Sequence, residues 1–228
     1  IINPSGVRVG PVPEILGPHR FRIGQTEILL YYGEPSPYSI SQEIYIDLLP
    51  VESYLTEGIW RIVLSAGKIV TGQYEMWLPS DNVLNRGTGF LFPTDATTLT
   101  IPSSASRAIS VGAYDARTFA YADFSGRGFT RLTNMVKPDL VAPGVEVMTT
   151  TVGGGYAAFT GTSFATPFVT GSVALLMEWG IVKGNDQYMY GEKLKAYLIN
   201  GATRVGNVWP DSARGWGELC VAASIPAK

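Results

Sequence analysis

Short segments in which apolar and polar residues alternate fill the first part of the chain. Four of these segments are rich in β-branched or aromatic residues and are bounded by Gly, Pro, Ser or Asn, which is typical of strands. They are Glu27–Tyr32, Gln42–Leu49, Gly58–Leu64 and Gly72–Pro79. We therefore predict an all-β sandwich or jelly-roll-like domain over residues 1–96, truncated at its start.

The pattern changes after residue 96, where short apolar strands begin to mix with longer helical segments. Strands are expected at Ala108–Tyr114 and Glu146–Val152. A helix from about Phe164 to Trp179 is apolar on nearly every side, which predicts burial on several faces. A second helix, Gly191–Asn200, has one apolar face and one charged face. We predict an α/β domain over residues 97–228.

Composition and charge restrict the classes of partner. Hydrophobic residues make up 46% of the chain and charged residues 16%, as in globular proteins. The net charge of -2 gives no electrostatic reason to expect nucleic acid. The apolar helix after Ser163 is expected to be shorter than the roughly 20 residues of a membrane span. We therefore expect neither a nucleic-acid partner nor a membrane partner.

The most chemically suggestive stretch is Gly161–Pro167, which places a serine between small residues at the start of the apolar helix. Pro167 is tolerated in the first helical turn, where its missing N–H has no intrahelical use. Gly161 and Ala165 leave the hydroxyl of Ser163 uncrowded. Free backbone N–H groups at a helix N-terminus suit a developing oxyanion. The alternative is an ordinary serine N-cap.

The other residues whose side chains could take part in catalysis are interpreted as structural. The only histidine, His19, falls in a turn before the first expected strand, and we interpret it as a surface-loop residue. Ser65–Lys68 is interpreted as a hairpin turn between two strands. Cys220 excludes an internal disulfide because it is the only cysteine, and we expect it to be a small buried hydrophobe.

Neither a cofactor nor a metal is expected. Four aspartates are scattered without ligand spacing, so surface carboxylates are the default interpretation. These are Asp115, Asp123, Asp139 and Asp186. The Gly153–Gly155 turn lacks the Lys-Ser/Thr pair of a phosphate-binding loop. Trp60, Tyr74 and Trp77 could line a carbohydrate or peptide groove, although aromatic residues in a sandwich more often belong to its core.

Five motifs in fixed order resemble those of the subtilisin-like serine proteases, or subtilases. Five subtilase motifs have counterparts in this chain: the Val-Gly-Ala strand, the Phe-Ser-x-x-Gly turn, the Pro-Asp-x-x-Ala-Pro-Gly segment, the nucleophile loop and the closing glycines. They are Ile109–Ala113, Phe124–Gly128, Lys137–Gly144, Gly161–Pro167 and Gly215–Gly217. The β-rich region before them is similar to the jelly-roll insert of the clostridial Csp germination proteases, through Gly58, Trp60 and Trp77–Pro79.

The resemblance implies that Ser163 is the nucleophile and that its backbone N–H helps to bind the oxyanion. Gly161, Thr162, Ala165 and Pro167 match the motif around it. In subtilases the chain order is Asp, His, Ser, so the catalytic Asp and His are expected upstream of this chain. The resemblance thus implies the C-terminal portion of a subtilase, with a peptide substrate and the missing N-terminal part of the catalytic domain as partners. It favours a secreted or spore- or envelope-associated bacterial protein.

Two rival functions stay open at this point. A pseudoprotease or scaffold would keep the fold and Ser163 but would have lost its Asp or His, and would act by binding a partner. The β-rich region could instead be an independent carbohydrate-binding module. An unrelated serine esterase is disfavoured because Gly-x-Ser-x-Gly is absent around Ser163. Without its base the serine hydroxyl is a poor nucleophile, so this chain alone is expected to be inactive.

Overall fold

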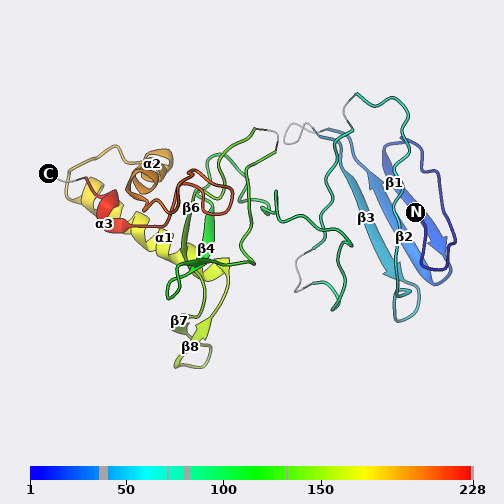
Figure 1. Ribbon diagram of the computed structural model, residues 1–228, viewed down its shortest axis with the longest axis horizontal. Helices are drawn as coiled ribbons and strands as arrows, with labels where there is room; N and C mark the ends of the chain where they lie inside the picture. Colours follow the sequence, from blue (N-terminus) through cyan, green and yellow to red (C-terminus); the bar gives the residue numbers. More distant parts are fainter. Residues whose placement is uncertain (36–40, 71, 80–82, 132, 227–228) are drawn as a thin grey trace. The chain divides into compact units, whose positions relative to one another are not determined.

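The computed structural model describes residues 1–35, 41–70, 72–79, 83–131 and 133–226. The chain divides into two compact units, Ile1–Trp77 and Leu78–Lys228 (Figure 1). Each unit builds its own sheet structure. The first is all-β, whereas the second combines parallel and antiparallel strands with helices. The domain boundary expected at residues 96–97 stays a prediction.

A three-stranded antiparallel sheet forms the core of the first unit. Its strands are β1 (Gly17–Ile23), β2 (Thr26–Tyr32) and β3 (Ile44–Pro50), with β2 in the centre. The alternation of residues dictates which face is buried, because neighbouring side chains in a strand point to opposite faces. Ile28 lies between Phe21 and Leu48 on the buried face.

Several expectations for this unit are wrong. His19 lies in β1, opposite Leu30, and not in a turn. Residues 58–64 and 72–79 form no strand; Arg61 makes only an isolated bridge to Ile2. Consequently Ser65–Lys68 is not a hairpin turn between strands. An alternating pattern becomes a strand only when a neighbouring segment pairs with it in a continuous ladder, and the described residues show no such ladder at these two segments. The small sheets do not confirm a jelly-roll.

The second unit is built around the parallel pair β4 (Val111–Asp115) and β6 (Leu140–Pro143). A short strand, β5 (Ala120–Tyr121), pairs antiparallel with the other edge of β4. Both parallel strands are nearly continuous apolar runs, as strands covered on both faces should be. Residues 217–219 extend the free edge of β6, since the N–H of Val141 donates to the carbonyl of Gly217 at 2.9 Å.

The long helix α1 (Thr162–Met177) packs across β4 and β6 (Figure 1). Its buried side chains, Ala165, Val169, Ser172 and Leu176, recur every three or four residues and so form one stripe. The expectation of burial on several faces is therefore wrong in this chain. Leu175, for example, is 52% exposed.

A π-helical turn, η1 (Glu178–Val182), continues α1 without a break. The combined segment, Thr162–Val182, has 21 residues, and its most apolar 18-residue stretch has a mean hydropathy of 1.3, which makes it long and apolar enough to cross a membrane by length and composition alone. The expectation that it is too short is wrong, because the π-helical turn lengthens it. Core helices of globular proteins meet the same criterion, and 28% of the most apolar stretch of this segment is buried.

The remaining elements complete the second unit. The hairpin β7 (Val147–Thr150) and β8 (Tyr156–Phe159) projects beyond the β4–β6 pair and turns through three glycines at positive φ, Gly153–Gly155 (Figure 1). Helix α2 (Gly191–Gly201) packs against α3 (Val221–Ser224). The positions of β7, the three-glycine turn and α2 agree with the sequence pattern, whereas β8 was not predicted.

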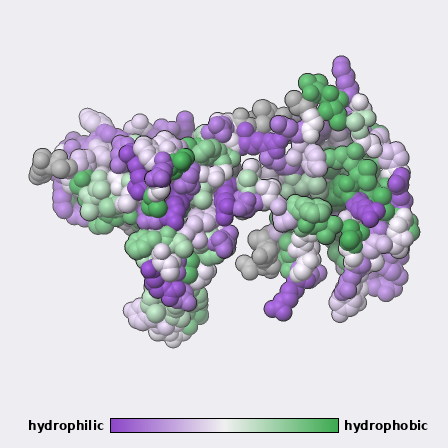
Figure 2. Space-filling model, in the orientation of Figure 1, coloured by the Kyte–Doolittle hydropathy of each residue, from purple (hydrophilic) through white to green (hydrophobic). Residues whose placement is uncertain are grey.

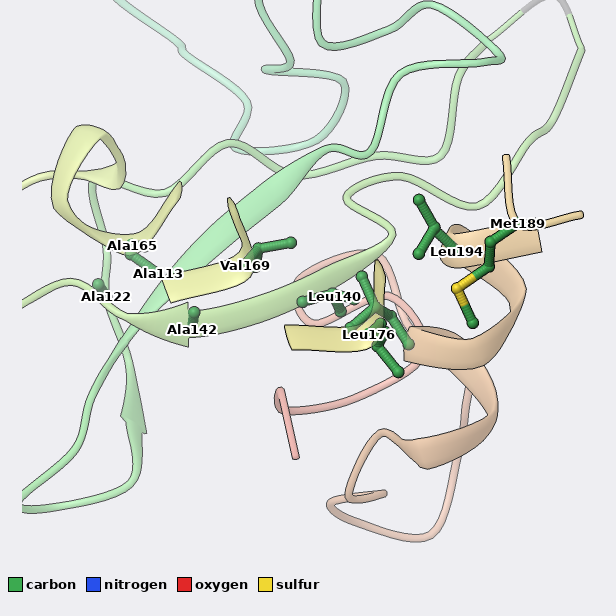
Figure 3. Packing of buried hydrophobic residues seen from close by; sticks show 10 residues of the cluster. Ala113, Ala122, Leu140, Ala142, Ala165, Val169, Leu176, Met189 and Leu194 are labelled. Carbon is green, nitrogen blue, oxygen red and sulfur yellow. The ribbon is translucent and has the colours of Figure 1, made fainter. Parts of the chain in front are cut away.

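The core of the second unit lies between α1, α2 and the sheet. Small residues occupy the place where α1 crosses the strands, and larger residues fill the space toward α2 (Figure 3). Ala113 and Ala165 are both fully buried, and their small side chains let the start of α1 approach β4 closely. Leu176 and Leu198 anchor the other end. This graded packing fixes the N-terminus of α1 against the sheet.

Candidate active site

Ser163 is presented at the second position of α1 by a tight turn. Gly161 is the N-cap, and its carbonyl accepts a hydrogen bond from the N–H of Phe164 at 3.0 Å. The N–H of Gly161 donates to the carbonyl of Gly144 at 2.8 Å, which ties the turn to the end of β6. Thr162 starts the helix, and Ala165 is buried against the sheet. The turn and the helix start thus confirm the predicted local structure.

The Ser163 side chain is exposed, and within the described part of the chain no hydrogen bond to its Oγ occurs. Nor does its backbone N–H donate to any described acceptor. The first N–H groups of a helix are left free by the i to i−4 pattern and carry the positive end of the helix dipole. The loop therefore presents a hydroxyl and a free N–H side by side, which is the combination an acyl-transfer site needs.

Pro167 departs from the sequence expectation. It lies inside α1, beyond the first turn, and the helix continues past it. A proline there lacks the N–H that would donate to the carbonyl four residues earlier. That carbonyl belongs to Ser163, so the nucleophile candidate lies at a point where one helical hydrogen bond is missing.

Two aromatic rings lie beside the serine. Phe159, at the end of β8, stacks on Phe164 with ring centroids 5.3 Å apart. Phe164 follows Ser163 directly, so the stack joins the hairpin to the first turn of α1. The pair packs the nucleophile loop against β8.

The other residues singled out from the sequence do not join Ser163 in a described catalytic arrangement. His19 belongs to the first unit, where its Nε2 lies 2.7 Å from the carbonyl of Ile15 and its ring stacks on Phe21. Cys220 is half-buried and precedes α3. Tyr74 and Trp77 are 66% and 61% exposed, so they are not core residues here.

The four aspartates are dispersed, as expected, but not all are at the surface. Among the described residues no group of three His, Cys, Asp or Glu side chains could hold a metal. Asp123 is exposed and Asp115 is paired with Arg117, whose backbone N–H helps to lower the Asp115 pKa. Asp139 is only 2% exposed, which overturns its interpretation as a surface carboxylate.

Asp139 is the centre of a buried charge cluster that the sequence reading missed. Its carboxylate accepts hydrogen bonds from Lys137 Nζ at 2.8 Å and from the N–H of Ser110 at 2.7 Å, and Lys195 Nζ lies 2.6 Å away. Lys137 also donates to the carbonyl of Ala108 at 2.7 Å. The signal in the sequence was Lys-Pro-Asp immediately before an apolar strand, where charges must be paired to be buried.

Asp186 takes part in a second cluster, between the π-helical turn and α2. Lys193 Nζ lies 2.6 Å from the carboxylate and the hydroxyl of Tyr197 donates to it at 2.9 Å. These hydrogen bonds, that from Lys193 foremost, hold the pKa of Asp186 below its usual value. The same carboxylate raises the pKa of both Lys193 and Tyr197.

A pH dependence follows from the lowered pKa of Asp186. The stabilisation is complete above the usual carboxyl pKa of about 4 and is lost as the pH falls through the lower pKa of the folded state. We expect Asp186→Asn to be less stable than the wild type at neutral pH and to lose less stability on acidification. Urea unfolding at several pH values tests this, with the exposed Asp123→Asn as control. If the free energy of unfolding fell equally with decreasing pH in the wild type and in Asp186→Asn, the prediction would be contradicted.

Comparison with known proteins gives a consistent result. The model of the family described as "Subtilase family" matches residues 61–217. Subtilisin BL of Lederbergia lenta is 35% identical over 112 residues, which are 49% of this chain and 36% of that protein. An intracellular serine protease of Paenibacillus polymyxa is 41% identical over 106 residues, 46% of this chain and 30% of that protein.

Among solved structures, the CspB protease of Clostridium perfringens matches with a TM-score of 0.81 and 35% identity. The match covers 98% of this chain but 47% of the CspB chain, so the present chain spans about half the length of that relative. The family model covers well over half of the chain and includes the loop that carries Ser163. The chain therefore belongs to the subtilase family.

Proposed function

We propose that this chain is the C-terminal part of a longer serine endopeptidase, in which Ser163 attacks the carbonyl of a peptide bond. The observation that carries the proposal is the exposed Ser163 beside its own free N–H at the start of α1. The catalytic Asp and His, and a side-chain oxyanion donor, would come from the sequence upstream. The substrate is a peptide or protein, as the protease names of the relatives suggest.

The chemistry would run in two steps. A base removes the proton from Ser163 Oγ as the oxygen attacks the scissile carbonyl, and the negative charge that develops on the carbonyl oxygen is met by the N–H of Ser163. Collapse of the tetrahedral species expels the amine, which takes up the proton, and water then releases the acyl group. Of these functions, the present chain supplies the nucleophile and one oxyanion donor.

The surface of α1 supports a missing N-terminal part. The side opposite its buried stripe bears Ser163, Pro167, Gly171 and Ala174, all small, and the helix also leaves Leu175 half-exposed. Small side chains permit close approach by another segment. A helix this apolar is normally covered on more than one face. We propose that the upstream part of the catalytic domain packs here and brings the base to Ser163.

We also propose that the first unit is part of a jelly-roll-like insert. It leaves many large apolar side chains exposed, and Figure 2 shows apolar residues gathered on its surface. In the segment after β3, Val63 is 59% exposed and Ile69 58%. Patches of this kind on a protein surface usually mark an interface. Additional strands from upstream would cover these exposed apolar side chains.

The pseudoprotease is the second candidate, favoured by one specific observation. Ser163 Oγ has no basic partner among the described residues, so none of them activates it. If the upstream sequence lacks either the Asp or the His, the parent would keep the fold and bind a partner without catalysis. The sequence preceding Ile1 distinguishes the two candidates at once.

A fluorophosphonate probe tests the proposed function directly. The parent polypeptide should be labelled, its Ser163→Ala variant should not, and the isolated chain should stay unlabelled because a serine without its base is a poor nucleophile. Efficient labelling of the isolated chain at Ser163 would sink the claim that the base lies upstream. A folded parent whose upstream sequence lacks the Asp or the His, and which takes up no label, would favour the pseudoprotease.

A further inference from the structure

Gly144 occupies the point where the sheet, the nucleophile loop and α1 meet. It directly follows β6 and is buried. A Cβ atom at this position would lie 2.6 Å from Cβ of Ala113, 3.0 Å from the carbonyl oxygen of Gly161 and 3.3 Å from Cβ of Ala165. Figure 3 shows Ala113 on the sheet and Ala165 on α1 close to each other at this place. Only a residue without a side chain fits between them.

Gly144 also links the two structures through its backbone. Its N–H donates to the carbonyl of Tyr114 in β4 at 3.0 Å, and its carbonyl accepts the N–H of Gly161 at 2.8 Å. Gly161 is the N-cap of the helix that carries Ser163. Gly144 therefore joins β4 by hydrogen bonds to the turn that presents Ser163.

The sheet side of this junction cannot easily move. The N–H of Ala113 donates to Oγ of the buried Ser125 at 3.0 Å, and its carbonyl accepts the N–H of Ala122 at 3.2 Å. Ala113 itself is fully buried. Any added volume at Gly144 must therefore displace the other side, which is the Gly161 turn and the first turn of α1.

We propose that Gly144 is a positioning residue for Ser163, which sets the distance between the nucleophile loop and β4. This inference rests on the proposed function, because it concerns the same serine. A methyl group at residue 144 would push the Gly161 turn away from the sheet and lengthen its hydrogen bond to residue 144. The serine would stay exposed and intact but would be displaced from its reacting geometry.

The test compares Gly144→Ala with Gly201→Ala in the parent polypeptide. A Cβ at Gly201 would lie 2.4 Å from atoms of Ser224 in α3, so this control is also severely crowded but does not contact the nucleophile loop. The probe is a fluorophosphonate. Its inactivation rate is measured at several probe concentrations, which gives the maximal rate and, independently, the concentration at which half of that rate is reached. A displacement near 1 Å costs about 100-fold in rate. We expect that loss in the maximal rate of Gly144→Ala alone, with the half-saturating concentration little changed.

A rescue variant separates positioning from general destabilisation. Ala113→Gly removes the nearest clashing atom, so the double variant Ala113→Gly/Gly144→Ala should recover part of the lost rate. Amide hydrogen exchange provides a readout independent of activity. The N–H of Gly161 should exchange faster in Gly144→Ala than in the wild type, whereas its exchange rate in Gly201→Ala should equal that of the wild type.

The outcomes distinguish this inference from the proposed function. Equal rates in wild type and Gly144→Ala, or equal losses in both glycine variants, would overturn the positioning role. An unlabelled wild type would count against the proposed function, and the exchange rate of Gly161 would then still decide whether Gly144 holds the loop. Unchanged exchange in Gly144→Ala would reject the inference by itself.

Discussion

Replacing Ser163 by alanine in the parent polypeptide is expected to lower turnover of a peptide substrate by on the order of 10⁶-fold, the scale measured in subtilisin when its nucleophilic serine is removed. The reason is that the methyl group of alanine cannot form the acyl intermediate, while the fold around it changes little. The side chain is exposed and makes no described hydrogen bond, so its removal leaves no partner unsatisfied.

Steady-state hydrolysis of a fluorogenic peptide measures this loss. Ser212→Ala is the matched control, because it removes an exposed serine hydroxyl from the same unit, and its turnover should equal that of the wild type. The melting temperatures of both variants should stay close to that of the wild type. Turnover retained in Ser163→Ala would assign the chemistry to a different nucleophile.

Asp139→Leu is expected to destabilise the chain by about 3–5 kcal/mol, the usual cost of breaking a buried ion pair by removing one partner. Two ammonium groups share this carboxylate: the side chain of Lys137 is 1% exposed and that of Lys195 17%. Without Asp139 both would be left in the interior with only backbone carbonyls as acceptors. The N–H of Ser110 would lose its partner as well.

Lys137→Met is the control, because it removes one of the two ammonium groups instead of the carboxylate that they share. It leaves Asp139 paired with Lys195 and with the N–H of Ser110, and methionine can fill a similar apolar volume. We expect this variant to cost no more than about 1 kcal/mol, since Asp139 keeps Lys195 as a partner and no buried charge is left uncompensated. Urea unfolding followed by circular dichroism gives both values. Equal costs for the two variants would contradict a shared carboxylate.

Alkaline pH gives a second test of the same cluster. Burial lowers the pKa of Lys137, and the nearby charge of Lys195 adds to this, while Asp139 opposes it. The unfolded chain therefore binds more protons than the folded chain between the lowered pKa and the usual value of about 10.4. The contribution of Lys137 to stability should rise with pH in that range. The rise should be absent from Lys137→Met.

Local patterns in the sequence predicted the second unit well. The nucleophile loop, strand β7 with the three-glycine turn after it, and α2 follow from turn residues and periodicity within short windows, and the structure places them accordingly. The Asp139 cluster was not predicted, because its two lysines come from different segments. Lys137 is two residues from Asp139, but Lys195 reaches it only after α2 has packed on the sheet.

The first unit shows what patterns cannot supply. Residues 58–64 alternate as a strand should, yet among the described residues they find no partner beyond the bridge at Arg61. Strand β1 shows the reverse error, a strand that was not predicted. His19, Phe21 and Ile23 alternate with two arginines as in a strand, but His19 and Arg20 were interpreted as part of a turn. Periodicity shows which side of a segment is apolar, but it does not show whether another segment pairs with it.

The three-glycine turn between β7 and β8 has a practical consequence. A Cβ at Gly153 or Gly154 would meet nothing within 4 Å, and the preceding Val152 is fully exposed. Loop tips of this kind tolerate added chain without disturbing the fold that carries them. The tip is thus a natural place to insert an affinity tag or a fluorophore, from which the arrival of a substrate or of the upstream polypeptide near Ser163 could be followed in solution.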